Sequence, residues 1–227
     1  MKRRAIGVYI ALLHAAVVAM LVQFDVLPRA SERVQMEIAR HRLAKIMERH
    51  HKALDRPVVL LGDSNIWLYG PTPHSVNYGV SGEVTEGLLN SMPRYAHSVR
   101  KASAVLLMIG INDLWAHKTS GLEERFSRIV SALPADVPLV WSSIVPAEDF
   151  RIDPAEIKAA NAAISALCRA RSGCTYVDTW SFLAKDGKQI PSLFRADGVH
   201  LSAEGYKQWS AALRGALAAA QQANADQ

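Results

Sequence analysis

The segment at residues 57–70, PVVLLGDSNIWLYG, constrains the fold of this chain most. The four apolar residues 58–61 follow a proline and include two valines, which is the pattern of a short buried strand. That pattern stops at Gly62, and a helix-compatible run follows at residues 66–69. Such a turn places Ser64 at the carboxyl end of a parallel strand, where ligands bind in open α/β sheets. Taken alone, the segment also fits an ordinary turn in which Ser64 caps a helix.

Four further apolar segments are predicted to be strands, at residues 76–82 with a glycine turn, 104–109, 138–145 and 174–178. Helical patterns occur at residues 83–92, ended by Pro93, at 123–133, at 153–170 and from Ser202 onward. Short apolar strands that alternate with helices predict an α/β fold, a flavodoxin-like three-layer α/β/α sandwich with a five-stranded parallel sheet. Because such connections are right-handed, the polar turns after the strands gather on one edge.

The first 27 residues carry a separate signal. Lys2, Arg3 and Arg4 precede an apolar run over residues 5–22, close to the ~20 residues that a membrane-spanning helix needs. A signal-peptide core is usually shorter, about 7–15 residues. Residues 1–27 are therefore predicted to be an uncleaved signal anchor with the basic end in the cytoplasm. A cleaved signal peptide is the alternative, with a buried soluble helix third, and both favoured interpretations export the rest of the chain.

Residues 28–55 have strong helix propensity, and Ser31 is available as an N-cap. A narrow semi-apolar stripe along this segment predicts a helical stalk or a helix docked on the domain. The globular domain is predicted to cover residues 56–220, and residues 221–227 are predicted to form a flexible tail.

Composition excludes some classes of partner and cofactor. The formal net charge is +5, but no basic tract is interleaved with aromatic residues, so nucleic acid is not predicted as a partner. The two cysteines, Cys168 and Cys174, do not belong to a Cys/His array at metal-ligand spacing, and no metal is predicted. They could form a small-loop disulfide in an oxidising compartment, and buried free thiols fit at least as well.

Unusual polar residues follow three of the predicted strands, and a further pair precedes the last helix. They are Ser64, Ser81 with Gly82, Asn112 with Asp113, and Asp197 with His200. Asp197 and His200 lie three apart across a turn, so the carboxylate can reach one imidazole nitrogen while the other faces outward. A general base that deprotonates a serine needs this arrangement.

These motifs resemble those of the GDSL, or SGNH, hydrolases. Residues 62–65, Gly-Asp-Ser-Asn, are similar to the first block, with Asn65 where leucine is common. Gly82 matches the glycine block, Asn112 in GINDLW matches the GxND block, and DGVHL at residues 197–201 matches the DxxH block. All four blocks occur in the family's order over roughly residues 57–217, and the combination is far more specific than any single block.

The resemblance implies a role for each matching residue. Ser64 would be the nucleophile, His200 the general base and then acid, and Asp197 the group that orients the imidazole. The oxyanion hole would consist of the backbone N–H groups of Ser64 and Gly82 and the side-chain amide of Asn112. No catalytic role remains for Asp63 or Asp113, which are interpreted as hydrogen-bonding supports for their turns. Trp115 and His117 are predicted to line the substrate pocket, whereas core packing is favoured for Trp67.

The sequence therefore predicts an exported serine hydrolase that cleaves carboxylic esters through an acyl-enzyme without a cofactor. The resemblance extends to acetyl esters of carbohydrates, lysophospholipids, thioesters and simple short-chain esters. The predicted location is the periplasmic side of the inner membrane, held there by the N-terminal helix, or the periplasm if that helix is cleaved. The alternatives are a membrane-anchored O-acyltransferase and a non-catalytic binding module on the same fold.

Overall fold

The computed structural model describes residues 34, 37–38, 40–43, 45–48, 52, 54–70 and 72–225. The chain divides into two compact units, residues 1–43 and 44–227. In the first unit the described residues are helical. The predicted signal anchor or signal peptide at residues 1–27 lies outside the described residues, and among those that are described no helix is long and apolar enough to cross a bilayer.

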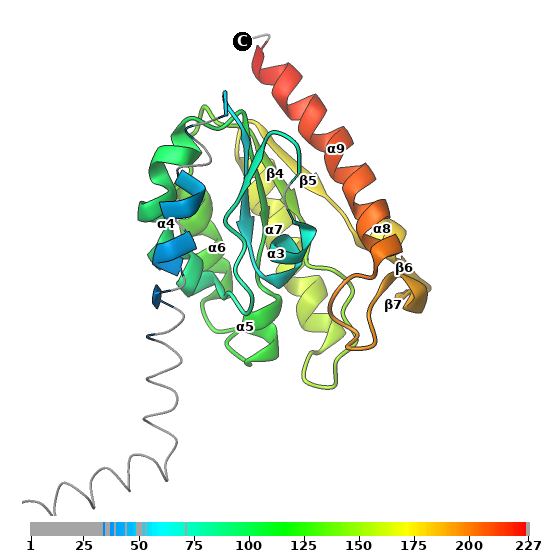
Figure 1. Cartoon of the computed structure of the whole chain (residues 1–227). Coiled ribbons are helices and arrows are strands. Elements are labelled where there is room, and N and C mark those ends of the chain that lie inside the picture. Colours follow the sequence, from blue (N-terminus) through cyan, green and yellow to red (C-terminus); the bar gives the residue numbers. More distant parts are fainter. Residues whose placement is uncertain are drawn as a thin grey trace, which may run out of the picture. The chain divides into compact units, whose positions relative to one another are not determined.

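A five-stranded, all-parallel sheet forms the centre of the second unit (Figure 1). Its strands are β1 (Val58–Gly62), β2 (Ser75–Asn77), β3 (Ala104–Met108), β4 (Leu139–Ser142) and β5 (Cys174–Val177). The order β2-β1-β3-β4-β5 is that of a flavodoxin-like sheet. The predicted five-stranded parallel sheet is therefore confirmed, and the observed strands overlap the five predicted segments.

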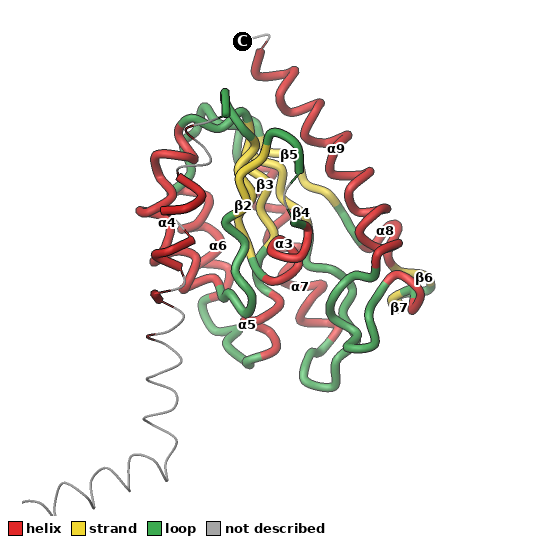
Figure 2. The backbone as a smooth tube through the Cα atoms, in the orientation of Figure 1, coloured by secondary structure: helices red, strands yellow, loops and turns green. Residues whose placement is uncertain are grey.

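Helices cover both faces of this sheet (Figure 2). The larger ones are α4 (Thr85–Arg100), α6 (Leu122–Ser131), α7 (Pro154–Ala170) and α9 (Ala203–Ala225). Short helices are α3 (Ser64–Tyr69), α5 (Ile111–Trp115), α8 (Trp180–Leu183) and the 3₁₀ turn η1 (Pro191–Leu193). Strand residues alternate between two cores, so that Leu107 of β3 packs with residues of α4, α6 and α7, while Leu106 packs with α9.

The segment before β1 is partly docked on the domain. Within the second unit, Met47 and Leu54 pack against the core on the α4, α6 and α7 face. At the other end of the chain, a flexible tail was predicted from residue 221, but α9 continues to Ala225. Alanine and glutamine favour helix there, and Gln221 Nε2 donates to Ser103 Oγ at 2.7 Å.

Two local predictions are wrong. Pro93 does not end its helix but lies inside α4, which continues to Arg100. The residues beyond it, including Tyr95 and Val99, are buried in the core, and this packing outweighs the missing backbone hydrogen bond. Turn residues such as Asp186 and Gly187 predict a loop without strands, but residues 184–189 form a small hairpin of β6 (Ala184–Lys185) and β7 (Lys188–Gln189), and both turn residues have positive φ.

Cys168 and Cys174 form a disulfide that joins the end of α7 to the start of β5. Of the two alternatives for these cysteines, the structure has the bridged form. Its loop is short, so the bridge constrains only a local connection.

Candidate active site

Ser64 begins α3 directly after β1, as the sequence predicts. Gly62 has φ 151°, and a Cβ there would lie 1.9 Å from the carbonyl oxygen of Met108, so the sharp turn requires glycine. Asp63 caps the helix, because its Oδ1 accepts the backbone N–H of Asn65 at 2.9 Å. The turn thus places the Ser64 hydroxyl at the carboxyl end of the sheet, beside a helix N-terminus.

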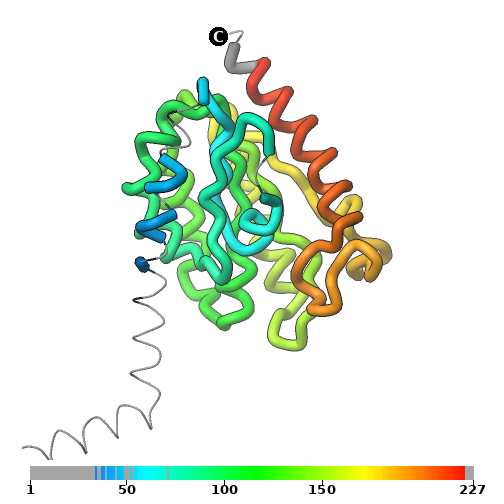
Figure 3. Tube along the Cα trace, in the orientation of Figure 1, coloured from blue at the N-terminus to red at the C-terminus, as the bar shows by residue number. Residues whose placement is uncertain are grey.

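The structure brings together Ser64, His200 and Asp197 in one hydrogen-bonded row. His200 Nε2 lies 2.8 Å from Ser64 Oγ, and His200 Nδ1 lies 2.8 Å from Asp197 Oδ2. Figure 3 shows how this happens, since the orange segment before α9 returns to the sheet edge at which β1 and β3 end. The geometry allows His200 to accept the serine proton while the carboxylate holds the opposite side of the ring.

Local contacts keep Asp197 ionised and oriented. Partial burial disfavours its charge, but the backbone N–H groups of Val199 and His200 both donate to Oδ1 at 2.9 Å, and the His200 ring contacts Oδ2. Together these hydrogen bonds lower the pKa of Asp197 below its usual range. A carboxylate that stays charged can stabilise the imidazolium that forms when His200 takes a proton.

The predicted oxyanion donors lie on the neighbouring turns. Gly82 has φ 72° in the turn after β2, a backbone conformation that glycine adopts readily. Asn112 is on α5, and its side-chain amide donates to the backbone oxygen of Glu83 at 2.9 Å. This bond uses one amide hydrogen and ties Asn112 to the segment next to Gly82, and the second amide hydrogen is left to donate elsewhere.

Buried polar groups support this arrangement from behind. Asp113 is buried and accepts from the backbone N–H of Thr85 at 2.9 Å and from its hydroxyl at 2.7 Å. Arg125 donates to the same hydroxyl at 2.7 Å and lies 3.5 Å from Asp113. Asp113 thereby links α5 to the start of α4, which holds the Asn112 and Gly82 turns together.

Asp63 is a second buried acid, with a different environment. It is 0% exposed, and its Oδ2 has no hydrogen-bond partner among the described residues. Burial, together with the nearby charges of Asp113 and Glu83, raises the pKa of Asp63 to about 7. The residue that caps α3 next to Ser64 is therefore a carboxyl group with a pKa near neutral pH.

Asn65 and Tyr206 are positioning residues that the sequence did not indicate. Asn65 is fully buried, and its Oδ1 accepts the backbone N–H of Leu201, the residue after His200, at 3.4 Å. The Tyr206 hydroxyl donates to the Asn65 backbone oxygen at 3.0 Å and lies 3.3 Å from Oδ1. Burial raises the pKa of Tyr206, so its hydroxyl remains a neutral donor. These contacts tie the nucleophile helix to the segment that carries His200.

The aromatic residues near the motifs differ from expectation in one case. Trp67, for which core packing was predicted, is 54% exposed. Trp115 is 42% exposed, and the guanidinium of Arg151 lies 4.1 Å from the centre of its ring. His117 lies on the exposed turn after α5, and its ring has no hydrogen-bond partner among the residues that the structure describes. That Trp115 and His117 line the substrate pocket stays a prediction.

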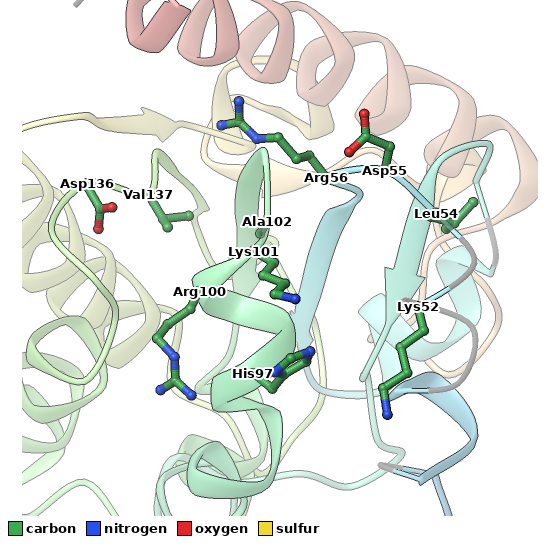
Figure 4. A pocket seen from close by; sticks show the side chains of 10 residues that line it. All are labelled: Lys52, Leu54, Asp55, Arg56, His97, Arg100, Lys101, Ala102, Asp136 and Val137. Atoms are coloured by element: carbon green, nitrogen blue, oxygen red, sulfur yellow. The ribbon is translucent and has the colours of Figure 1, made fainter.

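A pocket of about 580 Å³ lies at the opposite edge of the sheet, where β1, β3 and β4 begin (Figure 4). It is lined by Lys52, Leu54, Asp55, Arg56, His97, Arg100, Lys101, Ala102, Asp136 and Val137. Its lining is mainly basic and contains no residue of the Ser64, His200 and Asp197 row. Among the described residues, no group of three or more His, Cys, Asp or Glu side chains is arranged to hold a metal ion.

Comparisons with known proteins indicate the family and the fold of this chain. The family model described as GDSL-like lipase/acylhydrolase matches residues 60–208. A platelet activating factor protein from Streptococcus pneumoniae has a similar structure, with 21% identity, a TM-score of 0.72 and coverage of 88% of this chain and 99% of the other. No curated protein sequence matches this chain significantly.

Two further solved structures share the fold. One is the C-terminal catalytic domain of peptidoglycan O-acetyltransferase A from Streptococcus pneumoniae, with 19% identity, a TM-score of 0.60 and coverage of 74% of this chain and 96% of the other. The other is a carbohydrate esterase family 3 protein from Talaromyces cellulolyticus, with 19% identity, a TM-score of 0.58 and coverage of 73% and 98%. At such identities the likeness extends to the fold alone.

Proposed function

This chain belongs to the GDSL-like lipase and acylhydrolase family and is an ester hydrolase, and from that premise we propose that it cleaves short-chain carboxylic esters through an acyl-enzyme on Ser64. One observation carries the proposal. His200 Nε2 is 2.8 Å from Ser64 Oγ while Nδ1 is 2.8 Å from Asp197 Oδ2. A serine beside a base that is itself oriented by a carboxylate is the arrangement of an activated nucleophile.

In the acylation step, Ser64 Oγ attacks the ester carbonyl carbon as its proton passes to His200 Nε2. The negative charge that develops on the carbonyl oxygen is stabilised by the backbone N–H groups of Ser64 and Gly82 and by the remaining amide hydrogen of Asn112. The tetrahedral intermediate then collapses, the bond to the alcohol oxygen breaks, and His200 returns its proton to the leaving alcohol. Asp197 stays ionised throughout and stabilises the imidazolium.

Deacylation repeats these steps with water. His200 takes a proton from a water molecule, which attacks the acyl carbon, and the collapse of the second intermediate releases the acid and restores the Ser64 hydroxyl. A sugar hydroxyl in place of water would give acyl transfer by the same chemistry. This second function is favoured only by the fold shared with the peptidoglycan O-acetyltransferase domain, and the ratio of transfer to hydrolysis separates the two.

We further propose that the domain acts outside the cytoplasm, held at the periplasmic face of the inner membrane by residues 1–27 or released there by cleavage. The Cys168–Cys174 disulfide supports this location, because disulfides persist mainly in oxidising compartments. Ester groups on carbohydrates or lipids are the proposed substrates. Alkaline washing of membranes tests the anchor: an uncleaved anchor retains the full chain in the pellet, and complete release would contradict it.

The esterase proposal is tested with 4-nitrophenyl acetate. The full chain is expected to release 4-nitrophenol with a burst that corresponds to acylation, and Ser64→Ala is expected to reduce the rate to that of buffer. Ser81→Ala is the matched control, because Ser81 is exposed on the turn beside Gly82 and lies outside the row of Ser64, His200 and Asp197. Equal rates for the Ser64→Ala variant and the unmodified chain would overturn the proposal.

A further inference from the structure

Three large aromatic side chains are exposed at the catalytic edge of the sheet. Trp67 is 54%, Trp115 is 42% and Phe150 is 93% exposed. In the described part of residues 44–227, Ile46 is the only other large hydrophobic side chain of comparable exposure. Exposed apolar groups that cluster on one surface mark interaction sites. We call Trp67, Trp115 and Phe150 the aromatic platform.

Two members of the platform lie on the short helices that carry Ser64 and Asn112. Trp67 follows Ser64 by three residues on α3, and Trp115 follows Asn112 by three residues on α5. Residues three apart on a helix project from the same face. Each tryptophan therefore lies about one helical turn from a proposed catalytic group, Trp67 from Ser64 and Trp115 from Asn112.

Phe150 is linked to Trp115 through Arg151, which contacts both rings. The Arg151 guanidinium lies 4.1 Å from the centre of the Trp115 ring and 4.8 Å from that of the Phe150 ring. Arg151 also donates to Asp149 at 2.8 Å through Nε and at 2.6 Å through Nη2, and this hydrogen bonding lowers the pKa of Asp149 to about 2. The loop between β4 and α7 is thus tied to the end of α5 by a charged pair between two aromatic rings.

The same loop also contacts the segment that carries the proposed base. The backbone N–H of Glu148 donates to the carbonyl oxygen of Gly198 at 2.9 Å. A Cβ on Gly198 would lie 2.3 Å from the Glu148 carbonyl oxygen, so the two backbones pack closely. The loop that carries Phe150 is therefore in contact with the segment that carries His200 as well as with the end of α5.

We propose that the aromatic platform binds the pyranose rings of a carbohydrate chain whose ester is cleaved at Ser64, an inference that rests on the proposed esterase function. One face of a pyranose ring presents C–H groups, which pack on the flat face of an aromatic ring. The N–H groups of Arg151 that do not donate to Asp149, and the remaining lone pairs of the Asp149 oxygens, are donors and acceptors of the kind that sugar hydroxyls require.

An acyl chain fits this surface less well. The large hydrophobic side chains that are exposed at this edge are all aromatic, and the charged Arg151–Asp149 pair interrupts the apolar area between Trp115 and Phe150. A long acyl chain would have to cross that pair. It would displace water from the pair and offer no hydrogen bonds in place of those lost. The surface therefore favours a polar ligand with apolar ring faces over a continuous hydrocarbon.

The first test compares substrates. For the full chain and for Trp67→Ala, Trp115→Ala and Phe150→Ala, kcat/KM is measured on acetylated xylan, on 4-nitrophenyl acetate and on 4-nitrophenyl octanoate. The ratio of xylan to acetate ester activity is expected to fall about tenfold, chiefly through KM. Trp115→Phe should restore part of the ratio, and the control Ile46→Ala, which removes an equally exposed side chain outside these loops, should leave it unchanged. A fall in the octanoate-to-acetate ratio with a constant xylan-to-acetate ratio would overturn the proposal.

The second test measures binding without catalysis. Full-chain Ser64→Ala protein is titrated with xylohexaose, cellohexaose and chitohexaose while tryptophan fluorescence is recorded. At least one of these is expected to bind, with affinity about tenfold weaker when Trp67 or Trp115 is also changed to alanine. If none of the three binds, the platform does not recognise pyranose chains and the proposal fails. If an oligosaccharide binds but no Ser64-dependent ester cleavage is found, the esterase proposal fails and the platform stands.

Discussion

The polar residues at the two edges of the sheet differ in burial and in how firmly hydrogen bonds hold them. At the edge where the strands end, Ser64, Asp63 and Asp113 are buried or nearly so, and they take part in short, fixed hydrogen bonds. At the edge where the strands begin, the lining of the pocket in Figure 4 includes four exposed cations, Lys52, Arg56, Arg100 and Lys101, and two exposed acids, Asp55 and Asp136. Arg100 and Lys101 there have no ion pair with any described residue.

This difference shows why size alone does not identify a reactive centre. The basic pocket is roomy, but Arg100 and Lys101 in its lining are not fixed by an ion pair with any described residue. At the Ser64 edge, the proposed nucleophile, base and orienting carboxylate are joined by contacts of 2.8 Å. Catalysis depends on groups whose positions are fixed before the substrate arrives. The comparison therefore predicts large effects of substitution at one edge and small effects at the other.

Asp197→Asn should give the largest effect among the supporting residues. The amide nitrogen would donate to His200 Nδ1, which leaves the hydrogen on Nε2 and removes the base that faces Ser64. We expect kcat on 4-nitrophenyl acetate to fall by about 10⁴-fold with KM changed little. A variant that retains a tenth of the rate would show that Asp197 does not set the imidazole tautomer.

Asn112→Ala should come next. Loss of one oxyanion donor typically costs ~10²–10³ in turnover, and KM should change much less because the ground-state ester is held elsewhere. Steady-state kinetics with 4-nitrophenyl acetate measure both constants. Because Asn112 also donates to the Glu83 backbone oxygen, circular dichroism should confirm that the variant is folded. An unchanged kcat would remove Asn112 from the mechanism.

The two buried aspartates behind the site should respond in opposite directions to amide substitution. The raised pKa of Asp63, about 7, means that its contribution to stability is complete below pH ~4 and is lost as the pH rises through 7. Asp63→Asn keeps the cap acceptor without the charge, so thermal unfolding at pH 8 should occur at a temperature about 5 °C higher, with a smaller gain at pH 5.

Asp113→Asn provides the matched control at the same two pH values. It removes a carboxylate that both Thr85 and Arg125 contact, so its unfolding temperature should fall. If Asp63→Asn lowered the unfolding temperature at pH 8, burial of the ionised Asp63 carboxylate would not destabilise the folded protein.

The smallest effect is predicted at the opposite edge. Arg100→Ala combined with Lys101→Ala removes two exposed cations that contact no part of the Ser64 row, so kcat/KM on 4-nitrophenyl acetate should stay within about twofold. A tenfold change would mean that the two edges are energetically coupled, and the contrast between them would fail.

The sequence predicted those parts of the fold that depend on local patterns. The parallel sheet followed from short apolar segments separated by helical ones, and the polar turns after β1, β2 and β3 indicated one active edge. Ser64, Asn112 and His200 could be named because their blocks occur in a recognisable order. The Cys168–Cys174 bridge stayed undecided, because two cysteines six residues apart fit both a bridge and free thiols.

Features that depend on distant contacts could not be predicted. Asn65 looked like a departure outside the chemistry, but it binds Leu201 and Tyr206, which lie more than 130 residues away. Pro93 is a helix breaker by propensity, yet tertiary packing keeps α4 intact around it. The exposure of Trp67 likewise depends on which side of α3 meets the sheet, and this was not evident from the short motif.

Covalent labelling of Ser64 tests the central claim most directly. A fluorophosphonate probe reacts with a serine only when a neighbouring base activates it. The full chain should gain one adduct, located by peptide mass spectrometry on Ser64, and the rate of labelling should fall at least about 10³-fold in His200→Ala. Labelling at another serine, or labelling of Ser64 at the same rate without His200, would contradict the account.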